Sequence, residues 1–174
     1  MPVDLEFLIQ RMRKVFALVA CLSLCAVGWS ERLLEADRIV VHKSERKMEL
    51  YGHGKVLKTY RIALGPKSVG PKTRQGDHRT PEGHYRIDAK NAHSQFHLSL
   101  HISYPDTKDR QQARKAGVNP GGDIMIHGLP DRYAFLGALH TKYDWTDGCI
   151  AVTNEEIEEI WKLVPVGTKV EILP

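Results

Sequence analysis

From residue 38 onward, the chain alternates apolar and polar residues in short runs that turn-forming residues interrupt. The first three runs cover residues 38–43, 47–51 and 55–64, with Ser44-Glu45-Arg46 and Gly52-His53-Gly54 between them. A period of two places successive side chains on opposite faces of a strand, and such short connections suit hairpins. In the third run, Val56, Tyr60, Ile62 and Leu64 are expected to share one face. The pattern therefore predicts consecutive antiparallel strands.

Further short elements follow along the rest of the chain. Strands are predicted at residues 85–88, 97–103, 124–126 and 169–173, and a helix-compatible polar segment at 106–116. The last predicted helix has apolar residues at helical spacing, namely Ile157, Ile160, Trp161 and Val164. Thr153 or Asn154 is its expected N-cap. We therefore expect a mostly β fold with a few short helices, of the α+β class.

The N-terminal residues have the layout of a secretory signal. Arg11, Arg13 and Lys14 precede a largely apolar run at residues 15–29, and small residues would permit cleavage after Gly28. The run is shorter than the roughly 18 apolar residues of a spanning helix, which disfavours a permanent transmembrane segment. Leu18-Val19-Ala20-Cys21 resembles a bacterial lipobox and would instead leave Cys21 lipidated at the mature N-terminus. A buried helix is the third interpretation, although no amphipathic pattern flanks the run.

Length and composition indicate one folded domain after this segment. A chain of 174 residues with 42% hydrophobic and 26% charged residues suits a single globular domain. We predict a signal peptide or a membrane or lipid anchor at 1–28, a linker at 29–36, and the folded domain at 37–174. The formal charge of +4 favours an anionic partner, such as a wall polymer, acidic lipid or nucleic acid. Export and a content of only 7% aromatic residues argue against nucleic acid.

Only one cysteine certainly belongs to the folded domain. Cys21 and Cys25 lie in the export segment, which leaves Cys149 without a partner for a disulfide. An unused free thiol is a liability in an oxidising compartment, so Cys149 is either reactive or a buried structural residue. Attack requires the thiolate, and at an ordinary pKa near 8.5 only about 3% of a thiol is ionised at pH 7. A nucleophilic Cys149 would therefore use an imidazolium or aligned N–H groups to lower its pKa.

Gly148 and two histidines are candidates for this help. Gly148 lets the backbone bend sharply, so the N–H groups of Gly148 and Cys149 are expected to point at a developing oxyanion. His127 follows the predicted strand at 124–126 and precedes Gly128, whose carbonyl could accept from one ring nitrogen and fix the tautomer. His140 is the alternative base, but a surface histidine in a helix or loop is the simpler interpretation. We therefore predict His127 as the base.

Three other histidines could suggest a metal site. His93, His97 and His101 are spaced by four, which would align them on one face of a helix. The alternation of apolar and polar residues across 97–103 instead favours a strand. We therefore predict no metal site and place these histidines on the surface or along a cleft.

Residues 65–80 form a long basic loop. It contains several glycines and prolines together with four cations, which are Lys67, Lys72, Arg74 and Arg79. Loops of this length are often functional. The alternative is a solvated connection whose charges only aid solubility.

Three separated motifs stand out. They are Gly76-Asp77-His78-Arg79-Thr80-Pro81-Glu82-Gly83, Ile126-His127-Gly128 and Trp145-Thr146-Asp147-Gly148-Cys149-Ile150. In order and rough spacing they resemble the L,D-transpeptidase catalytic domain family, also called the YkuD domain. The closing Val164-Pro165-Val166-Gly167-Thr168 fits the same family. The resemblance covers approximately residues 37–174, which is nearly all of the predicted mature chain.

The resemblance implies a YkuD-type β-sandwich domain in which Cys149 attacks a peptide carbonyl of a peptidoglycan stem. The resulting thioester would be resolved by an amine or by water, with His127 as general base and acid and the Gly128 carbonyl orienting it. The candidates for oxyanion or substrate binding are Gly148, Thr146, Asp147 and Arg79. The family needs no metal or organic cofactor. Such an exported enzyme would work in the periplasm or cell envelope and contact the membrane only through its N-terminal segment.

Two departures from the family pattern bear on the reaction. Ser or Thr followed by His often precedes Gly-Cys, whereas this chain has Thr146-Asp147, and an Arg often stands where this chain has Ala151. The sequence Gly-Cys-apolar-Ala resembles a branch that includes a murein hydrolase releasing an envelope lipoprotein. Such a lipoprotein is therefore a further candidate partner, and hydrolysis is an alternative to cross-linking. The missing positive charge could come from Lys72, Arg74 or Arg79.

Two rival functions fit the sequence less well. Papain-like and NlpC-type cysteine peptidases place the nucleophile before the histidine, whereas His127 precedes Cys149 here. A non-catalytic wall-binding domain would account for the basic loop, but it would have no use for a reactive thiol. The sequence therefore favours the transpeptidase, with a hydrolase of the same fold as the alternative.

Overall fold

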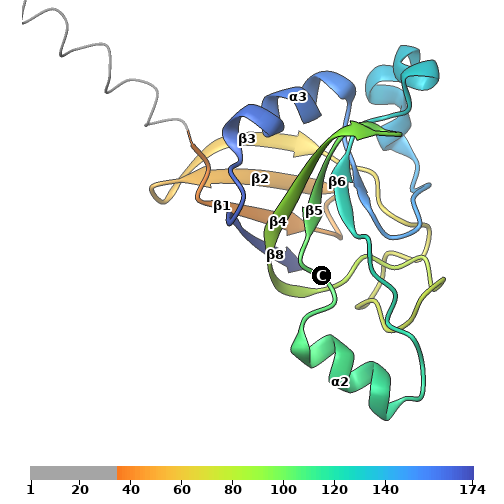
Figure 1. Ribbon diagram of the computed structural model, residues 1–174. Coiled ribbons are helices and arrows are strands. Elements are labelled where there is room, and N and C mark those ends of the chain that lie inside the picture. The colour runs from red at the N-terminus through yellow and green to blue at the C-terminus, as the bar shows by residue number, and fades with distance from the viewer. Residues whose placement is uncertain (1–34) are drawn as a thin grey trace, which may run out of the picture. The chain divides into compact units, whose positions relative to one another are not determined.

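A sheet of eight strands is the framework of residues 35–174, the part of the chain that the computed structural model describes (Figure 1). The strands are β1 (Arg38–His42), β2 (Lys47–Gly52), β3 (Lys55–Arg61), β4 (Gly83–Ser94), β5 (His97–Ile102), β6 (Met125–His127), β7 (Ile150–Ala151) and β8 (Lys169–Leu173). Their order across the sheet is β3-β2-β1-β8-β4-β5-β6-β7. The helices of this region are α2 (Thr107–Lys115), α3 (Asn154–Leu163) and the 3-10 segment η2 (Asp131–Lys142). The predicted mostly β fold with a few short helices is confirmed.

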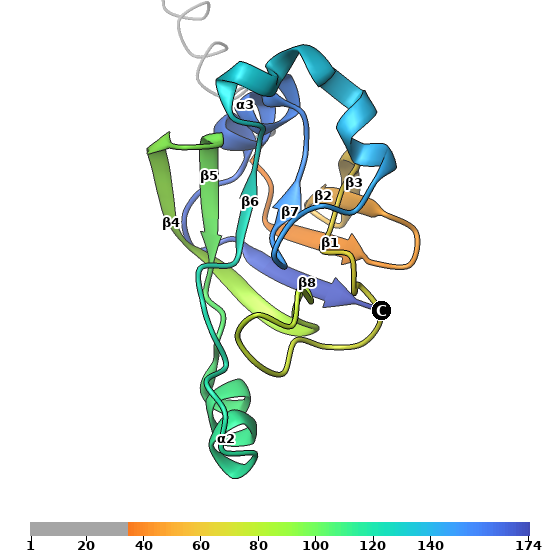
Figure 2. The ribbon, with the colours of Figure 1, turned by 90° about the vertical axis from the view of Figure 1, so that its right-hand side faces the viewer.

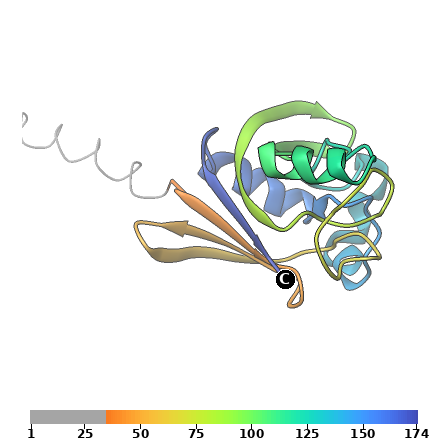
Figure 3. The ribbon, with the colours of Figure 1, turned by 90° about the horizontal axis from the view of Figure 1, so that it is seen from below.

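The sheet curls around a core that α3 helps to fill. Figure 2 shows β4, β5 and β6 turned away from the direction of β1, and Figure 3 shows α3 inside the bend. Ile157 and Ile160 of α3 are fully buried and belong to one apolar cluster with side chains from all eight strands. Burial of each such side chain contributes about 1.5–3 kcal/mol. This core holds the strand ends that carry the candidate site.

The hairpins β1–β2 and β2–β3 form as predicted, but one face of β3 differs from the expectation. Val56 is 49% exposed, whereas Leu57 packs against the core together with Tyr60. The pairing register shifts between Leu50 and Tyr51, which marks a β-bulge. A shift of one residue turns a side chain to the other face of the sheet. The prediction that Val56 shares the buried face of Tyr60 is therefore wrong.

Both α-helices within residues 35–174 begin with a capping box. In α2, the Asp106 side chain accepts from the Asp109 N–H while the Asp109 side chain accepts from the Asp106 N–H. In α3, Thr153 and Glu156 make the same reciprocal pair. These bonds satisfy donors that a helix N-terminus otherwise leaves free. The predicted helix at 106–116 and the predicted cap at Thr153 are confirmed.

The predictions for the N-terminus concern residues outside the described region. Residues 1–28, predicted as a signal peptide or anchor, and residues 29–34 of the predicted linker are not described. Within residues 35–174, no helix is both long enough and apolar enough to span a bilayer.

Candidate active site

Parallel pairing of β6 and β7 brings two of the predicted catalytic residues to one face of the sheet. Ile126 lies opposite Ile150, and His127 lies opposite Ala151. Both isoleucines point into the core. Ala151 therefore lies on the face of His127, and side-chain alternation extended by one residue beyond β7 would place Cys149 on the same face. Figure 2 shows β6 and β7 next to each other at one end of the sheet.

The turn before β7 is held by Thr146. Its hydroxyl donates to the Cys149 carbonyl at 2.7 Å and accepts from the Gly148 N–H at 3.2 Å. Gly148 has a φ of +116°, and a Cβ on it would overlap the carbonyl oxygen of Arg79. Only glycine fits this position without strain. Since the Gly148 N–H donates to Thr146, the Cys149 N–H is the better candidate for an oxyanion donor, and Thr146 holds the turn.

His127 is buried and its tautomer is defined by its neighbour. Its Nδ1 lies 2.7 Å from the Gly128 carbonyl oxygen, so Nδ1 carries the proton and donates, and Nε2 keeps its lone pair. This is the hydrogen bond that the sequence predicted. Burial lowers the pKa of His127 to about 4, although the Gly128 carbonyl opposes this and the nearby His140 adds to it. The imidazole is therefore neutral at neutral pH.

Cys149 is a half-buried free thiol. Its Sγ donates to the carbonyl oxygen of Asp123 at 3.4 Å. Burial raises the pKa of Cys149; the Met125 N–H and Lys72 lower it, and the carboxylates of Asp147 and Asp123 raise it further. The sequence led us to expect an imidazolium or aligned N–H groups that lower this pKa, but burial of both groups favours a neutral thiol and a neutral imidazole.

Two of the predicted substrate-binding residues make contacts of their own. Asp147 is 89% exposed and accepts from His78 Nδ1 at 2.7 Å. Arg79 presents its backbone to Gly148, while its guanidinium donates to the Pro71 carbonyl at 3.4 Å. The side chain of Arg79 thus extends along the basic loop.

The basic loop contains an internal ion pair. Lys72 and Asp77 are both buried, with Lys72 Nζ 2.9 Å from Asp77 Oδ1. Burial opposes ionisation of Asp77, yet the Lys72 bond and the N–H groups of Thr73, Arg74 and Arg79 lower its pKa to about 2. Of the three cations suggested to replace the family arginine, Lys72 is the one whose charge acts on the Cys149 thiol. Much of that charge is compensated by Asp77.

The predicted motifs did not reveal an aromatic cluster around His127. Its ring centroid lies 4.4 Å from that of Phe96 and 5.8 Å from that of Trp145. His140, which we expected on the surface, is only 7% exposed and lies 6.0 Å from Trp145. The position of Trp145, directly before the Thr146 turn, was the one available sequence signal. Phe96 reaches the site only through the pairing of β5 with β6.

An open pocket of about 850 Å³ adjoins this aromatic cluster. Its lining residues include Phe96, Tyr133, His140, Tyr143 and Trp145. Most of the lining is apolar, as is usual for sites that bind organic ligands.

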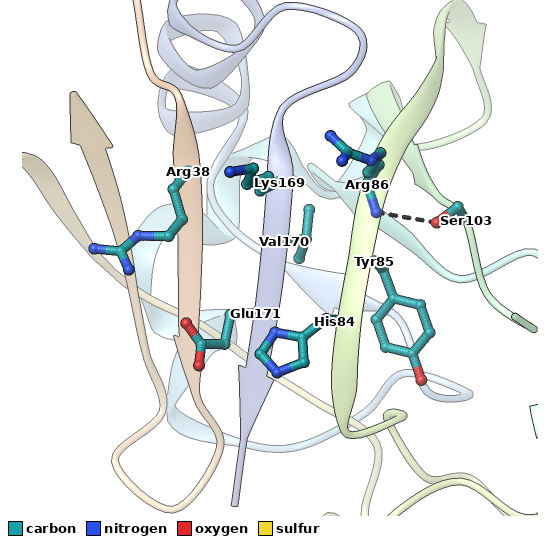
Figure 4. A pocket seen from close by; sticks show the side chains of 8 residues that line it. All are labelled: Arg38, His84, Tyr85, Arg86, Ser103, Lys169, Val170 and Glu171. Atoms are coloured by element: carbon teal, nitrogen blue, oxygen red, sulfur yellow. Dashed lines mark hydrogen bonds between the residues drawn. The ribbon is translucent and has the colours of Figure 1, made fainter. Parts of the chain in front are cut away.

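A second concavity, of about 470 Å³, lies on the exposed face of β1, β8 and β4 (Figure 4). Arg38, Lys169 and Arg86 stand opposite one another across these three strands. None of the predicted site residues lines this groove, so it is separate from the candidate active site.

The histidines considered for zinc make other contacts. His97 lies between Asp131 and Glu158, at 2.9 and 2.8 Å, and His101 pairs with Asp88 at 2.6 Å. Within residues 35–174, no group of three or more His, Cys, Asp or Glu side chains is arranged to hold a metal ion.

Comparison with known protein families identifies the class. The model of the YkuD family, described as the L,D-transpeptidase catalytic domain, matches residues 36–172. The chain therefore belongs to the YkuD family of L,D-transpeptidase catalytic domains.

Two curated relatives carry names of the same class, assigned provisionally. YafK of Escherichia coli (strain K12) is 30% identical over 132 residues, covering 72% of this chain and 46% of YafK. YqjB of Bacillus subtilis (strain 168) is 27% identical over 137 residues, covering 77% of this chain and 69% of YqjB. The chain thus spans about half the length of YafK.

Solved structures share the fold. The helical cell shape determining protein Pgp2 from Campylobacter jejuni is 25% identical, with a TM-score of 0.60 over 79% of this chain and 47% of Pgp2. An L,D-transpeptidase from Mycobacterium smegmatis is 14% identical, with a TM-score of 0.53 over 80% of this chain and 59% of that one. The second similarity concerns the fold alone.

Proposed function

We propose that the protein is a cysteine-dependent L,D-transpeptidase that acts on peptidoglycan stem peptides through a thioester. The observation that carries this proposal is the pairing of β6 with β7, which sets His127 opposite Ala151 and directly beside the segment that begins at Cys149, with His127 Nδ1 bonded to the Gly128 carbonyl. That bond leaves Nε2 as the proton acceptor. Membership of the YkuD family supports the same reaction class and the peptidoglycan substrate.

In the proposed first step, His127 Nε2 takes the thiol proton as Sγ of Cys149 bonds to a carbonyl carbon of the stem peptide. The Cys149 N–H stabilises the negative charge on the carbonyl oxygen. When the tetrahedral intermediate collapses, the carbon–nitrogen bond breaks and the leaving amine receives the proton from His127. A thioester on Cys149 remains.

In the second step, an acceptor amine attacks the thioester while His127 Nε2 takes a proton from it. The carbon–sulfur bond breaks, and the Cys149 sulfur recovers that proton from His127. A neutral thiol and a neutral imidazole suit this mechanism, because the proton moves during attack and no resting ion pair is needed.

Water as the acceptor is the second candidate function, which would make the protein an L,D-carboxypeptidase or amidase-type murein hydrolase. Ala151, in the place of the family arginine, lies directly opposite His127 and is fully buried. The face that carries His127 therefore lacks a cation at this position, which removes one contact for a carboxylate-bearing substrate.

We place this activity in the periplasm or cell envelope, where peptidoglycan is accessible to an exported enzyme. The N-terminal sequence supports export, and the name of Pgp2, a helical cell shape determining protein, supports a role in cell shape. An envelope lipoprotein is a further candidate for the acylated or released partner.

The test is mass spectrometry of defined muropeptides incubated with the purified chain and, as a control, with Cys149→Ala. Dimers linked through diamino acids are expected for a transpeptidase, and shortened or released stems for a hydrolase. If no stem yields a product that depends on Cys149, the proposed function is wrong.

A further inference from the structure

His140 is a buried titratable group that the proposed reaction does not use. It lies near the end of η2 and is only 7% exposed. Burial lowers the pKa of His140, so its ring is neutral at neutral pH. A neutral imidazole has one donor and one acceptor nitrogen, and the structure shows which is which.

The indole of Trp145 determines the tautomer of His140. Trp145 Nε1 lies 3.3 Å from His140 Nδ1. An indole nitrogen can only donate, so Nδ1 is the acceptor and the ring proton is on Nε2. Nε2 is buried and has no hydrogen-bond partner among the described residues. The Val152 carbonyl acts on the ring and raises its pKa, which partly opposes the effect of burial.

The imidazole is therefore held in one tautomer, with its acceptor nitrogen committed to the indole of Trp145.

Trp145 packs against both His140 and His127. Its ring is steeply inclined to both imidazoles, with interplanar angles of 70° to His140 and 71° to His127. Phe96 also packs against His127, with 4.4 Å between the ring centroids and an interplanar angle of 39°. A change in the Trp145 ring would therefore reach the His127 ring directly.

We propose that His140 is a positioning residue: by accepting the Trp145 N–H it fixes the indole, which holds His127 in the orientation that takes the proton from Cys149. This inference rests on the proposed role of His127 as the base. Its chemistry requires only a lone pair on the atom that faces Trp145 Nε1. An asparagine carries such an acceptor at a similar distance from the backbone, whereas leucine has none and the longer glutamine places its oxygen elsewhere.

The test is the rate of Cys149 alkylation by iodoacetamide in the full chain, measured from neutral to alkaline pH. His140→Leu is expected to slow alkylation about 10-fold at neutral pH, where a base must remove the thiol proton. Above the thiol pKa the thiolate forms without a base, so the variant and the wild type should converge. His140→Asn should stay within about 3-fold of the wild type, and His140→Gln should resemble His140→Leu.

Trp145→Phe keeps the ring but removes the donor. It is expected to slow neutral alkylation as His140→Leu does, and the double variant should be no slower than either single one. Trp145→Phe also provides the test if circular dichroism shows that His140→Leu does not fold.

Equal rates of Cys149 alkylation at neutral pH for the wild type and Trp145→Phe would overturn the inference. A slower alkylation of the variants that persists at alkaline pH would also overturn it. Alkylation needs no stem peptide, so its outcome is independent of the muropeptide assay. A chain that turns over no muropeptide could still show the His140 effect, and the reverse also holds.

Discussion

The backbone of Gly148 packs directly against the carbonyl oxygen of Arg79, so the residue before the candidate nucleophile has no room for a side chain. The contact joins the upstream motif at 76–83 to the Gly-Cys motif. The two separated motifs therefore meet at one place in the fold, next to Cys149.

Gly148→Ala is therefore expected to displace the turn. The added Cβ meets the Arg79 carbonyl at a positive φ, which should lower the free energy of unfolding by about 2–4 kcal/mol. Alkylation of Cys149 should fall by roughly 100-fold. The control is Gly54→Ala, which has a positive φ but no atom within 4 Å of the new Cβ and should cost about 1–2 kcal/mol. Equal costs at both positions would contradict the packing argument.

Thr146→Val tests whether the hydrogen bonds of the Thr146 hydroxyl hold the same turn. The variant keeps the shape but loses the bonds to the Cys149 carbonyl and the Gly148 N–H. We expect a loss of about 1–3 kcal/mol in chemical denaturation and slower turnover of the muropeptide substrate. Thr146→Ser retains the hydroxyl and should recover most of both. No difference between the valine and serine variants would show that the hydroxyl does not hold the turn.

The pH dependence of the reaction should reflect a neutral pair. The pKa of His127 is lowered to about 4 and that of Cys149 is raised, so both groups are uncharged at neutral pH. As the pH is lowered from neutral, we expect kcat/KM to remain high until the pH approaches the His127 pKa. Below that pH, kcat/KM should fall because the base becomes protonated. Ultraviolet absorbance of the thiolate should appear only above neutral pH. A thiolate already present well below neutral pH would contradict this prediction.

Asp77 should make the free energy of unfolding depend on pH in the acidic range. Its pKa in the folded protein, about 2, lies below the ordinary 3.8 because Lys72 and three N–H groups stabilise the charged form. A lowered pKa stabilises the fold at pH values above the unfolded-state pKa. That contribution, about 2 kcal/mol, is lost as the pH falls from 3.8 towards 2. Denaturation at several acidic pH values measures it.

Asp77→Asn should remove this acid dependence and also destabilise the protein at neutral pH. It leaves Lys72 buried without its carboxylate, which costs about 3–5 kcal/mol. Asp88→Asn, at a more exposed pair with His101, should cost less than about 1 kcal/mol. Similar losses for the two variants would contradict the importance of burial.

Asp147 should tune the thiol without supporting the fold. Its carboxylate is exposed and raises the pKa of Cys149 by repelling the thiolate. Asp147→Asn should lower that pKa and speed neutral alkylation about 2- to 3-fold, while the free energy of unfolding changes by less than about 0.5 kcal/mol. Slower alkylation would show that Asp147 assists the thiol rather than repelling it.

Local patterns predicted much of the fold. The strand at 169–173, the helix after Thr153 and the first two hairpins depend on alternation, capping and short turns, which are properties of neighbouring residues. β4 continues to Ser94, well beyond the predicted 85–88, because its second half is stabilised by pairing with β5. The side chains of this half are mostly exposed. Alternation of hydrophobicity is absent there, so no local pattern indicated this part of the strand.

The candidate site likewise depends partly on local sequence patterns and partly on contacts between distant segments. The sequence by itself determined that Cys149 follows a turn glycine and that His127 ends a buried strand beside a carbonyl able to orient it. Only the tertiary structure decided that both groups are neutral, since burial depends on residues brought together from β5, η2 and the basic loop. It also decided that His140 is buried against Trp145 and that Lys72 is paired with Asp77, because such contacts between distant segments leave no periodic signal in the chain.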